Sequence, residues 1–296
     1  MKADDSGIRW GVEQRLEFIE FRLFWEGSLN RSDITRYFGV SVPQASNDLS
    51  RYQDLAPNNI EYDRSDKRYL ASKRFKPIFL KPDADRYLNQ LRSISDGVLP
   101  AQQTWLSNTP EFESMPLPRR RVDPAFLRTL LATIREKRSI QIHYQSLTRA
   151  DAVWRWITPH ALGSDGFRWH VRAFCHEERI FKDFLLPRFL DLKGQAEPGA
   201  PAEADHIWAE HIDVVLVPHP DLTKSQRRVV ALDFGMIGES IKVPVRLALL
   251  YYFLKRLNLD GDAERRPSKE QHIVLGNKAD VRAGLKRAQE QMPLAA

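Results

Sequence analysis

Hydrophobic residues recur at helical spacing in the first third of the chain. Leu16, Ile19 and Leu23 lie three and four residues apart, which predicts a first helix. A second, shorter helix is expected to begin at Asn30, a good N-cap residue, and to end at Gly39. Glycine adopts the left-handed conformation without strain, so Gly39 suits a tight turn into a third helix.

The third helix is expected to present a polar face. Within "SVPQASNDLSRYQDL" (41–55), Ser41 can cap the helix, while Ala45 and Leu49 are spaced to bury one side. Short hydrogen-bonding side chains and Arg51 remain outward, and such groups can read base edges in the major groove of DNA. A small helical domain with a solvated polar face is the alternative interpretation.

A basic hairpin is predicted after the third helix. Residues 60–71 read as a strand, a turn and a returning strand, and three cations cluster at the turn. A helix, a short helix, a tight turn, a third helix and a basic hairpin together predict a winged helix-turn-helix, which we expect to bind duplex DNA. The predicted DNA contacts are Ser41, Gln44, Ser46, Asn47, Ser50 and Arg51 on the helix and Arg64, Lys67 and Arg68 on the hairpin.

The middle third alternates between apolar and polar residues, and turns at 163–166 and 176–179 separate short strands. This pattern predicts a small antiparallel β-barrel. In "FRWHVRAFC" (167–175) the predicted buried face holds Phe167, Trp169, Val171, Ala173 and Cys175. The opposite face carries Arg168, His170 and Arg172, whose donors suit a phosphate-bearing ligand or a nucleic-acid backbone. A solvated barrel exterior is the alternative.

The last third alternates strands with helices, which predicts an α+β unit. Proline- and glycine-rich stretches separate the thirds. The whole chain is therefore expected to be an α+β multidomain protein. The predicted parts are a DNA-binding domain at 1–95, a linker at 96–121, a barrel at 122–193, a second linker at 194–204 and an α+β domain at 205–296.

Composition narrows the partners and the compartment. The 296 residues carry a net charge of +6, and residues 119–193 alone carry +7, from 15 Lys/Arg and 8 Asp/Glu. A basic middle third points to a polyanionic partner. No apolar stretch is long enough to span a membrane, and no signal peptide is recognisable. Cys175 is the single cysteine, which excludes an intrachain disulfide, so a cytoplasmic protein is expected.

The order of these motifs resembles the WYL-domain transcriptional regulators, over nearly the whole chain. The resemblance rests on "HYQS" (143–146), "TPHAL" (158–162), "RWHV" (168–171) and "LPRF" (186–189). "SVPQASNDLSRY" and "RWHVRAFC" are most similar to BrxR- and CapW-type repressors, which are encoded beside phage-defence (BREX and CBASS) operons. The family tripeptide Trp-Tyr-Leu is here Trp169-His170-Val171, so the family's ligand preference does not carry over directly.

The resemblance implies an Sm/SH3-like barrel and a C-terminal dimerisation domain. It also implies a homodimeric repressor of a phage-defence operon that binds an inverted-repeat operator and senses a ligand. The basic barrel favours a nucleotide or oligonucleotide effector. The predicted ligand-binding residues are Tyr144, Ser146, His160, Arg168, Trp169, His170, Arg172, Lys182 and Arg188.

No enzymatic chemistry is predicted. The chain lacks GxxxxGK[ST], GxGxxG, HExxH and GxSxG motifs, and its histidines match no common zinc spacing, so neither a metal nor a cofactor is expected. One alternative of another class stays open, an accessory protein that binds single-stranded nucleic acid and modulates a nuclease. Preference for duplex operator over single strands would distinguish the repressor from this alternative.

Overall fold

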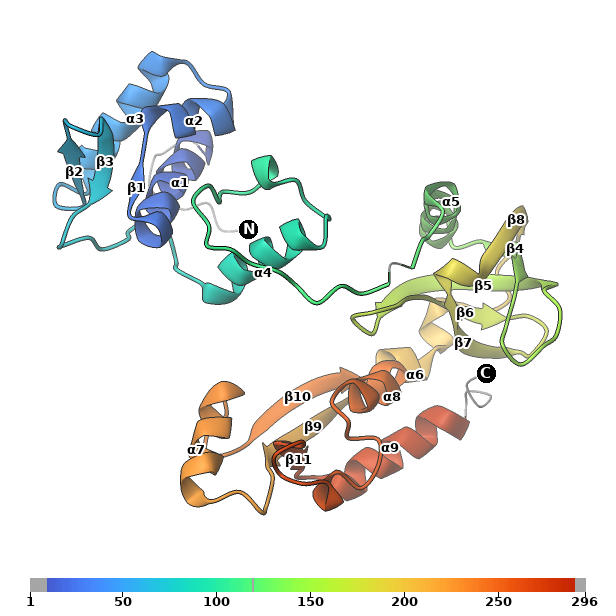
Figure 1. Ribbon diagram of the computed structural model, residues 1–296. Coiled ribbons are helices and arrows are strands. Elements are labelled where there is room, and N and C mark those ends of the chain that lie inside the picture. The colour runs from blue at the N-terminus through green and yellow to red at the C-terminus, as the bar shows by residue number, and fades with distance from the viewer. Residues whose placement is uncertain (1–9, 119, 291–296) are drawn as a thin grey trace. The chain divides into compact units, whose positions relative to one another are not determined.

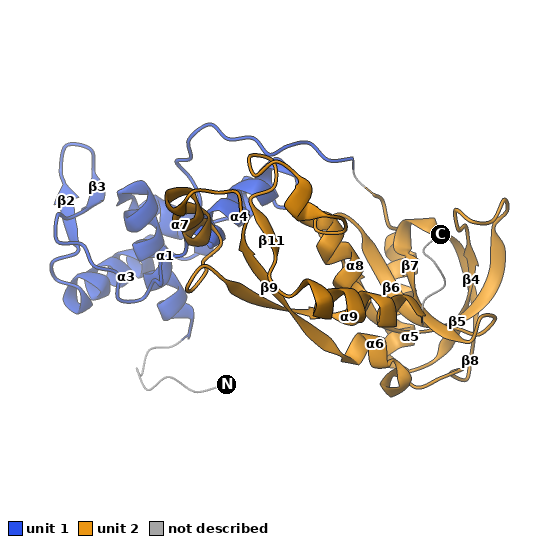
Figure 2. Ribbon diagram, turned by 90° about the horizontal axis from the view of Figure 1, so that it is seen from below, with its two compact units in different colours: residues 1–118 blue, residues 119–296 orange. Residues whose placement is uncertain are grey.

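A computed structural model describes residues 10–118 and 120–290, which fall into two compact units (Figure 2). Unit 1 ends at Pro118 and unit 2 begins at Arg119, so the division falls inside the predicted linker 96–121. Within the described residues, no helix has the length and apolarity needed to cross a membrane.

Unit 1 contains a winged helix-turn-helix (Figure 1). The backbone N–H of Asn30 donates to Asp33 Oδ2 at 2.6 Å, and Gly39 adopts φ 65°, so the sequence signals for both ends of the second helix are confirmed. The strands pair antiparallel in the order β1-β3-β2. The elements are α1 (Trp10–Glu26), β1 (Ser28–Leu29), α2 (Arg31–Phe38), α3 (Val42–Leu55), β2 (Ile60–Asp63), β3 (Arg68–Ala71) and α4 (Ala84–Ser95).

A buried carboxylate organises the core of unit 1. Glu20 on α1 is fully buried and accepts backbone hydrogen bonds from Ile78, Phe79 and Leu80 at 2.7–2.9 Å. It also accepts a bond from Tyr52 Oη on α3, at 3.0 Å. Because the charge of Glu20 is fully hydrogen-bonded, one side chain ties α1 to α3 and to the chain that follows the wing.

The predicted linker 96–121 is partly core. Trp105 and Leu106 are buried against α1, and the ring of Trp105 makes edge contacts with Phe18 and Phe21 at 5.8 and 5.4 Å between centroids. The proline and polar residues around this segment predicted a linker, whereas its two apolar side chains pack in the core of the domain.

Unit 2 begins with α5 (Pro124–Arg135) and a five-stranded antiparallel sheet of order β7-β6-β5-β4-β8. Leu130 of α5 is fully buried in a core with Ile142, Ile157 and Val171. Among the described strands, the edge strands β7 and β8 do not pair with each other, so the sheet is open and the expected closed barrel is not confirmed. The strands are β4 (Ser139–Tyr144), β5 (Val153–Ser164), β6 (Trp169–Cys175), β7 (Ile180–Leu185) and β8 (Phe189–Ala196).

The predicted faces of "FRWHVRAFC" need correction. Trp169 is 53% exposed and Phe167 is 42% exposed, whereas His170 and Arg172 are buried. The outer face of β6 is not solvated, because residues that follow the sheet in sequence cover it and supply partners for the polar side chains. The inner residues Val171 and Cys175 are buried as predicted.

The remainder of unit 2 has the predicted alternation of strands and helices. A three-stranded antiparallel sheet of order β10-β9-β11 packs against α8 and α9 around a core that includes Val214, Leu250 and Val281 (Figure 1). The elements are α6 (His206–Ala209), β9 (His211–Pro218), α7 (Lys224–Asp233), β10 (Ile241–Arg246), α8 (Leu247–Arg256), β11 (Ile273–Leu275) and α9 (Lys278–Glu290).

Candidate nucleic-acid interface and effector pocket

The outer face of α3 offers unpaired polar side chains. Asn47, Ser50 and Arg51 are exposed and lie three and four residues apart, so they share one face of the helix. Their side chains form no hydrogen bond or ion pair with any other described residue. Ala45 and Leu49 are buried on the opposite side, as predicted. This face can therefore donate to and accept from an external partner.

Three other predicted contacts on α3 are engaged within the protein. Ser41 Oγ accepts from the backbone N–H of Gln44, and Ser46 Oγ donates to the carbonyl oxygen of Val42 at 2.9 Å. Gln44 Nε2 donates to Asp48 Oδ1 at 3.1 Å, and Asp48 is in turn held by Arg15 at 2.6 Å. The Arg15–Asp48 pair therefore orients the amide of Gln44.

The hairpin presents cations at its turn. Arg64 and Lys67 are exposed, and Asp63 Oδ1 accepts from two backbone N–H groups of the turn, which shapes it. Arg68 is half-buried and donates to Ser28 Oγ at 3.4 Å, so it is less available than the other two. The turn thus carries two cations that can contact phosphates.

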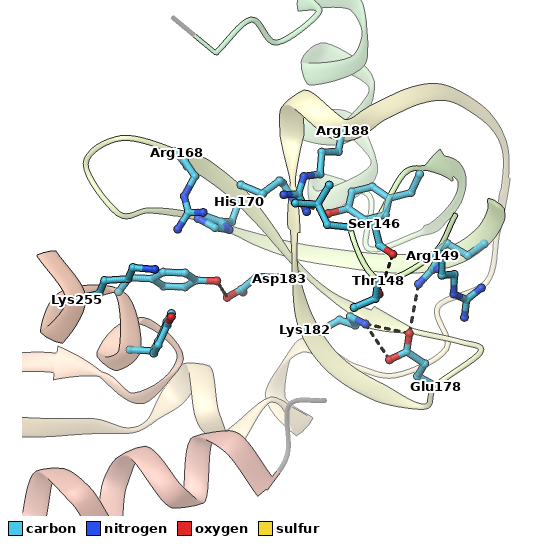
Figure 3. Close-up of a pocket in the computed structure, with 16 residues that line it drawn as sticks. Ser146, Thr148, Arg149, Arg168, His170, Glu178, Lys182, Asp183, Arg188 and Lys255 are labelled. Carbon is cyan, nitrogen blue, oxygen red and sulfur yellow. Dashed lines mark hydrogen bonds and ion pairs between the residues drawn. The ribbon is translucent and has the colours of Figure 1, made fainter. Parts of the chain in front are cut away.

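A pocket of about 510 Å³ lies in unit 2, between the five-stranded sheet and α8 (Figure 3). This volume is typical of a small-molecule site. Both parts of unit 2 contribute, because Tyr251, Tyr252 and Lys255 come from α8. The sheet and its loops supply Tyr144, Ser146, Leu147, Thr148, Arg149, Arg155, Arg168, His170, Glu178, Lys182, Asp183, Leu185 and Arg188.

The pocket lining has an excess of positive charge. Glu178 compensates Lys182 at 2.8 Å and Arg155 at 3.3 Å. Arg188 and Lys255, in contrast, form no ion pair or side-chain hydrogen bond within the described part of the chain. The pocket therefore retains cationic donors without an internal anionic partner, and Lys255 Nζ lies 5.7 Å from the centre of the Tyr251 ring.

His170 and Asp183 form the buried base of the pocket with Tyr252. Burial lowers the pKa of His170, against the opposing effect of the carboxylates of Asp183 and Asp165, so the imidazole is neutral near pH 7. Its ring lies 4.8 Å from that of Tyr252, and Nε2 has no hydrogen-bond partner among the described residues. Tyr252 Oη donates to Asp183 Oδ2 at 3.3 Å, and burial raises the pKa of Asp183.

Arg172 and His160 do not line the pocket, contrary to expectation. Arg172 is 1% exposed and donates from Nε and Nη2 to the two oxygens of Asp205, at 2.7 and 3.0 Å. His160 Nε2 lies 2.9 Å from the same carboxylate. Burial would raise the pKa of Asp205, but the hydrogen bonds from His160 and Arg172 outweigh it and hold the pKa at about 2. Both predicted ligand residues therefore anchor Asp205, the N-cap of α6.

The other predicted ligand residues divide between the pocket and the surface. Trp169 does not line the pocket, whereas Tyr144, Ser146, Arg168, His170, Lys182 and Arg188 do. The prediction omitted Arg149, Arg155 and the three α8 residues. Arg149 and Arg155 belong to the same basic third, so its positive charge could have indicated them as ligand-binding residues. Nothing local in "YYFLK" (251–255) indicates that α8 would close a pocket on a sheet that ends about fifty residues earlier.

Family comparisons follow the same order along the chain. The winged helix-turn-helix domain of the BrxR transcriptional regulator matches residues 11–93, the WYL domain matches 125–193, and the BrxR C-terminal dimerization domain matches 211–281. A winged helix, a WYL sheet with a cationic pocket and this C-terminal domain together define the class of WYL-domain transcription regulators.

Curated relatives narrow the class. DNA-binding transcriptional repressors named CapW are 39% identical in Stenotrophomonas maltophilia and 38% identical in Escherichia coli (strain KTE188), each over 95% of this chain and 94% of the relative. CapW of Pseudomonas aeruginosa is 40% identical over 94% of this chain and 93% of its own. The chain therefore belongs to the family of CapW DNA-binding transcriptional repressors.

One solved structure, proteasome accessory factor B/C (PafBC) of Arthrobacter aurescens, is 17% identical. It aligns with 99% of this chain, which spans 52% of that protein, at a TM-score of 0.26. This similarity is too low to support an argument about the fold.

Proposed function

We propose that the protein is a homodimeric repressor that binds an inverted repeat in duplex DNA and releases it when an anionic ligand occupies the pocket. The observation that carries the DNA-binding part is the unpaired face of α3, next to a hairpin with two exposed cations. The CapW relatives are named DNA-binding transcriptional repressors, and the C-terminal match is to a dimerization domain, which supports the same conclusion.

The exposed residues of α3 suit base recognition. Arginine can donate two bonds to guanine, asparagine can pair with adenine, and serine adapts to either. Arg51, Asn47 and Ser50 hold these positions with no internal bond to break on binding. Gln44 is proposed as a further contact that Asp48 orients in advance. One such helix reads only a few base pairs, so a second copy on a repeated half-site supplies the remaining specificity.

Arg51→Ala is the direct test of this interface. We expect a loss of about 1–3 kcal/mol in operator binding, confined to one base position in each half-site. The assay is fluorescence anisotropy with a duplex from the protein's own upstream region and with variants of each base pair. Arg92→Ala removes the same charge from the exposed face of α4 and serves as the matched control.

Two results would contradict the placement of the interface. One is operator affinity and base preference unchanged in Arg51→Ala. The other is tighter binding of wild-type protein to a single strand than to the duplex, which would favour the accessory nucleic-acid-binding protein instead.

The pocket is proposed to bind a nucleotide or a short oligonucleotide. Arg188 and Lys255 provide cationic donors that form no ion pair within the described residues, and Tyr144, Tyr251 and Tyr252 add aromatic rings. Phosphate oxygens match such donors, and bases stack on aromatic rings. A ligand that releases DNA must bind the DNA-free conformation better, and a tenfold release needs about 1.4 kcal/mol of differential affinity.

Arg188→Ala tests the effector site in cells. Cells that carry a reporter driven by the protein's own promoter are challenged with phage. Phage is chosen because the chain resembles repressors of phage-defence operons. We expect Arg188→Ala to repress as wild type does before challenge and to fail to induce afterwards. Arg179→Ala, an exposed arginine in the turn after β6 that does not line the pocket, is the control. Normal induction in Arg188→Ala would contradict the sensor assignment.

A further inference from the structure

A second cavity lies beside the effector pocket. It has a volume of about 310 Å³ and is lined by residues of unit 2. Arg168, Tyr252 and Lys255 line both cavities, so the two lie next to each other. Figure 3 shows Arg168 and Lys255 at the opposite end of the effector pocket from Arg149 and Lys182. We call this second cavity the side pocket, and none of the residues that it adds was predicted to bind a ligand.

The side pocket carries an excess of positive charge. Arg120, Arg168, Lys255 and Arg256 line it, together with the carboxylate of Asp165. That carboxylate is already engaged, because Oδ2 accepts from Arg168 Nε at 2.7 Å and Oδ1 accepts from two backbone N–H groups of its own loop. Burial would raise the pKa of Asp165, but these hydrogen bonds outweigh it and lower the pKa to about 2. Arg120, Lys255 and Arg256 therefore remain, and none of them forms an ion pair with another described residue.

The loop that carries Asp165 is shaped around Arg256. Gly166 adopts φ 82°, and a Cβ atom at this position would lie 1.8 Å from Arg256 Nη1. Only glycine leaves room for the guanidinium here. Nη1 donates to the backbone carbonyl oxygen of Asp165 at 2.8 Å. The loop thus holds Arg256 at the side pocket through an uncharged group, so the positive charge is not neutralised.

Arg120 is held at the side pocket by an aromatic ring. Its guanidinium carbon lies 4.8 Å from the centre of the Phe167 ring, and Phe167 is 42% exposed. Such a cation–π contact uses the face of the guanidinium and leaves its N–H donors available to an anion. Arg120 lies two residues after Pro118, where unit 1 ends. An anion bound by Arg120 would therefore contact the first residues of unit 2.

We infer that the side pocket binds a second phosphate group of the effector, with Arg120, Lys255 and Arg256 as its donors. The inference rests on the nucleotide or oligonucleotide ligand of the proposed function, and it specifies a ligand with at least two phosphate groups. Arginine suits this role because its planar fork of donors matches phosphate oxygens. Arg188 lines the effector pocket alone, and Arg120 lines the side pocket alone. A ligand with one phosphate can therefore occupy only one of the two cationic sites.

Three dinucleotides that differ by one phosphate test the inference. TpT has only its internal phosphate, whereas pTpT and TpTp add a second phosphate at the 5′ or the 3′ end and so cover both chain directions. Isothermal titration calorimetry of the full chain measures the three affinities. We expect wild type to bind the better two-phosphate probe about tenfold or more tighter than TpT, because the added phosphate gains charge-assisted hydrogen bonds. Arg120→Ala should remove most of this gain and leave the affinity for TpT unchanged.

Two further variants serve as controls. Arg121→Ala removes a neighbouring exposed arginine that lines neither cavity, and it should bind all three probes as wild type does. Arg188→Ala should weaken TpT as well, because Arg188 lines the effector pocket. Thermal unfolding of unit 2 should be unchanged in Arg120→Ala and Arg121→Ala, since both side chains are exposed.

The outcomes separate the side pocket from the effector pocket. Equal affinity of wild type for the three probes would overturn the side pocket, and so would a gain that survives in Arg120→Ala. In either case, binding of TpT that Arg188→Ala weakens would leave the proposed function standing. If none of the probes binds wild type, the nucleotide effector of the proposed function fails, and the side pocket fails with it.

Discussion

Arg172 offers a strong test of how unit 2 is held together. Its guanidinium is 1% exposed and donates to two buried carboxylates, with contacts of 2.7 and 3.0 Å to Asp205 and 3.4 Å to Asp183. Asp205 caps α6 at the start of the C-terminal domain, while Asp183 lines the pocket. The substitution Arg172→Ala removes the one cation that, among the described residues, contacts both of these anions.

The size of the effect follows from the bonds that remain. Breaking a buried ion pair by removing one partner costs about 3–5 kcal/mol, because a charge stays buried without compensation. Asp205 would keep His160 and the backbone N–H of Trp208, and Asp183 would keep Tyr252. Asp183 can also take up a proton, since burial already raises its pKa. We therefore expect Arg172→Ala to lower the free energy of unfolding by about 3 kcal/mol, the lower end of this range.

The assay is thermal and urea unfolding of the full chain, followed by a signal from unit 2. For a unit of this size, a loss of about 3 kcal/mol lowers the melting temperature by roughly 6–12 °C. Arg188→Ala is the control, because Arg188 is half-buried and forms no ion pair within the described residues. It should cost less than about 1 kcal/mol.

A stable Arg172→Ala protein would refute this reasoning. If its unfolding free energy lay within about 1 kcal/mol of wild type while induction was lost, Arg172 would act on the ligand as the strand pattern first suggested. Destabilisation without a specific loss of ligand response supports the structural role.

Three further predictions concern other charges. Glu20→Ala should destabilise unit 1 by about 3 kcal/mol in urea unfolding, because three backbone N–H groups, of which that of Leu80 is buried, lose a charged acceptor, and Glu20→Gln should cost less. The pKa of Asp205 is lowered from 3.8 to about 2, so this carboxylate stabilises the fold above pH 4. About 2 kcal/mol of the free energy of unfolding is lost as the pH falls from 4 to 2. Asp205→Asn should flatten that part of the acid-unfolding profile. Arg64→Ala should weaken all duplexes alike and lower the slope of log affinity against log salt by about one.

Much of the fold was readable from local patterns. The ends of α2 follow from Asn30 and Gly39, and the spacing of Ala45 and Leu49 predicted which side of α3 is buried. The alternation of strands and helices in the last third also appears in the structure. These features depend on contacts among residues close in sequence, so periodicity and capping chemistry were enough to predict them.

The candidate site was only partly readable. The charge of the middle third indicated a cationic surface, and Arg188 and Lys182 do line the pocket. Strand periodicity wrongly placed Trp169 inside and Arg172 outside. The alternation of apolar and polar residues along a strand indicates that its two faces differ. It does not indicate which face a later part of the chain will cover.

The sequence by itself determined the elements, their order and the sign of the charge that each carries. Only the tertiary structure decided which charges are neutralised inside the protein and which stay available to a partner. Asp205 reaches Arg172 across 33 positions, and Tyr252 reaches Asp183 across 69. Such pairings depend on how α6 and α8 pack on the sheet. Because that packing buries a cation beside carboxylates, the cation forms a structural ion pair and is not available to an external partner.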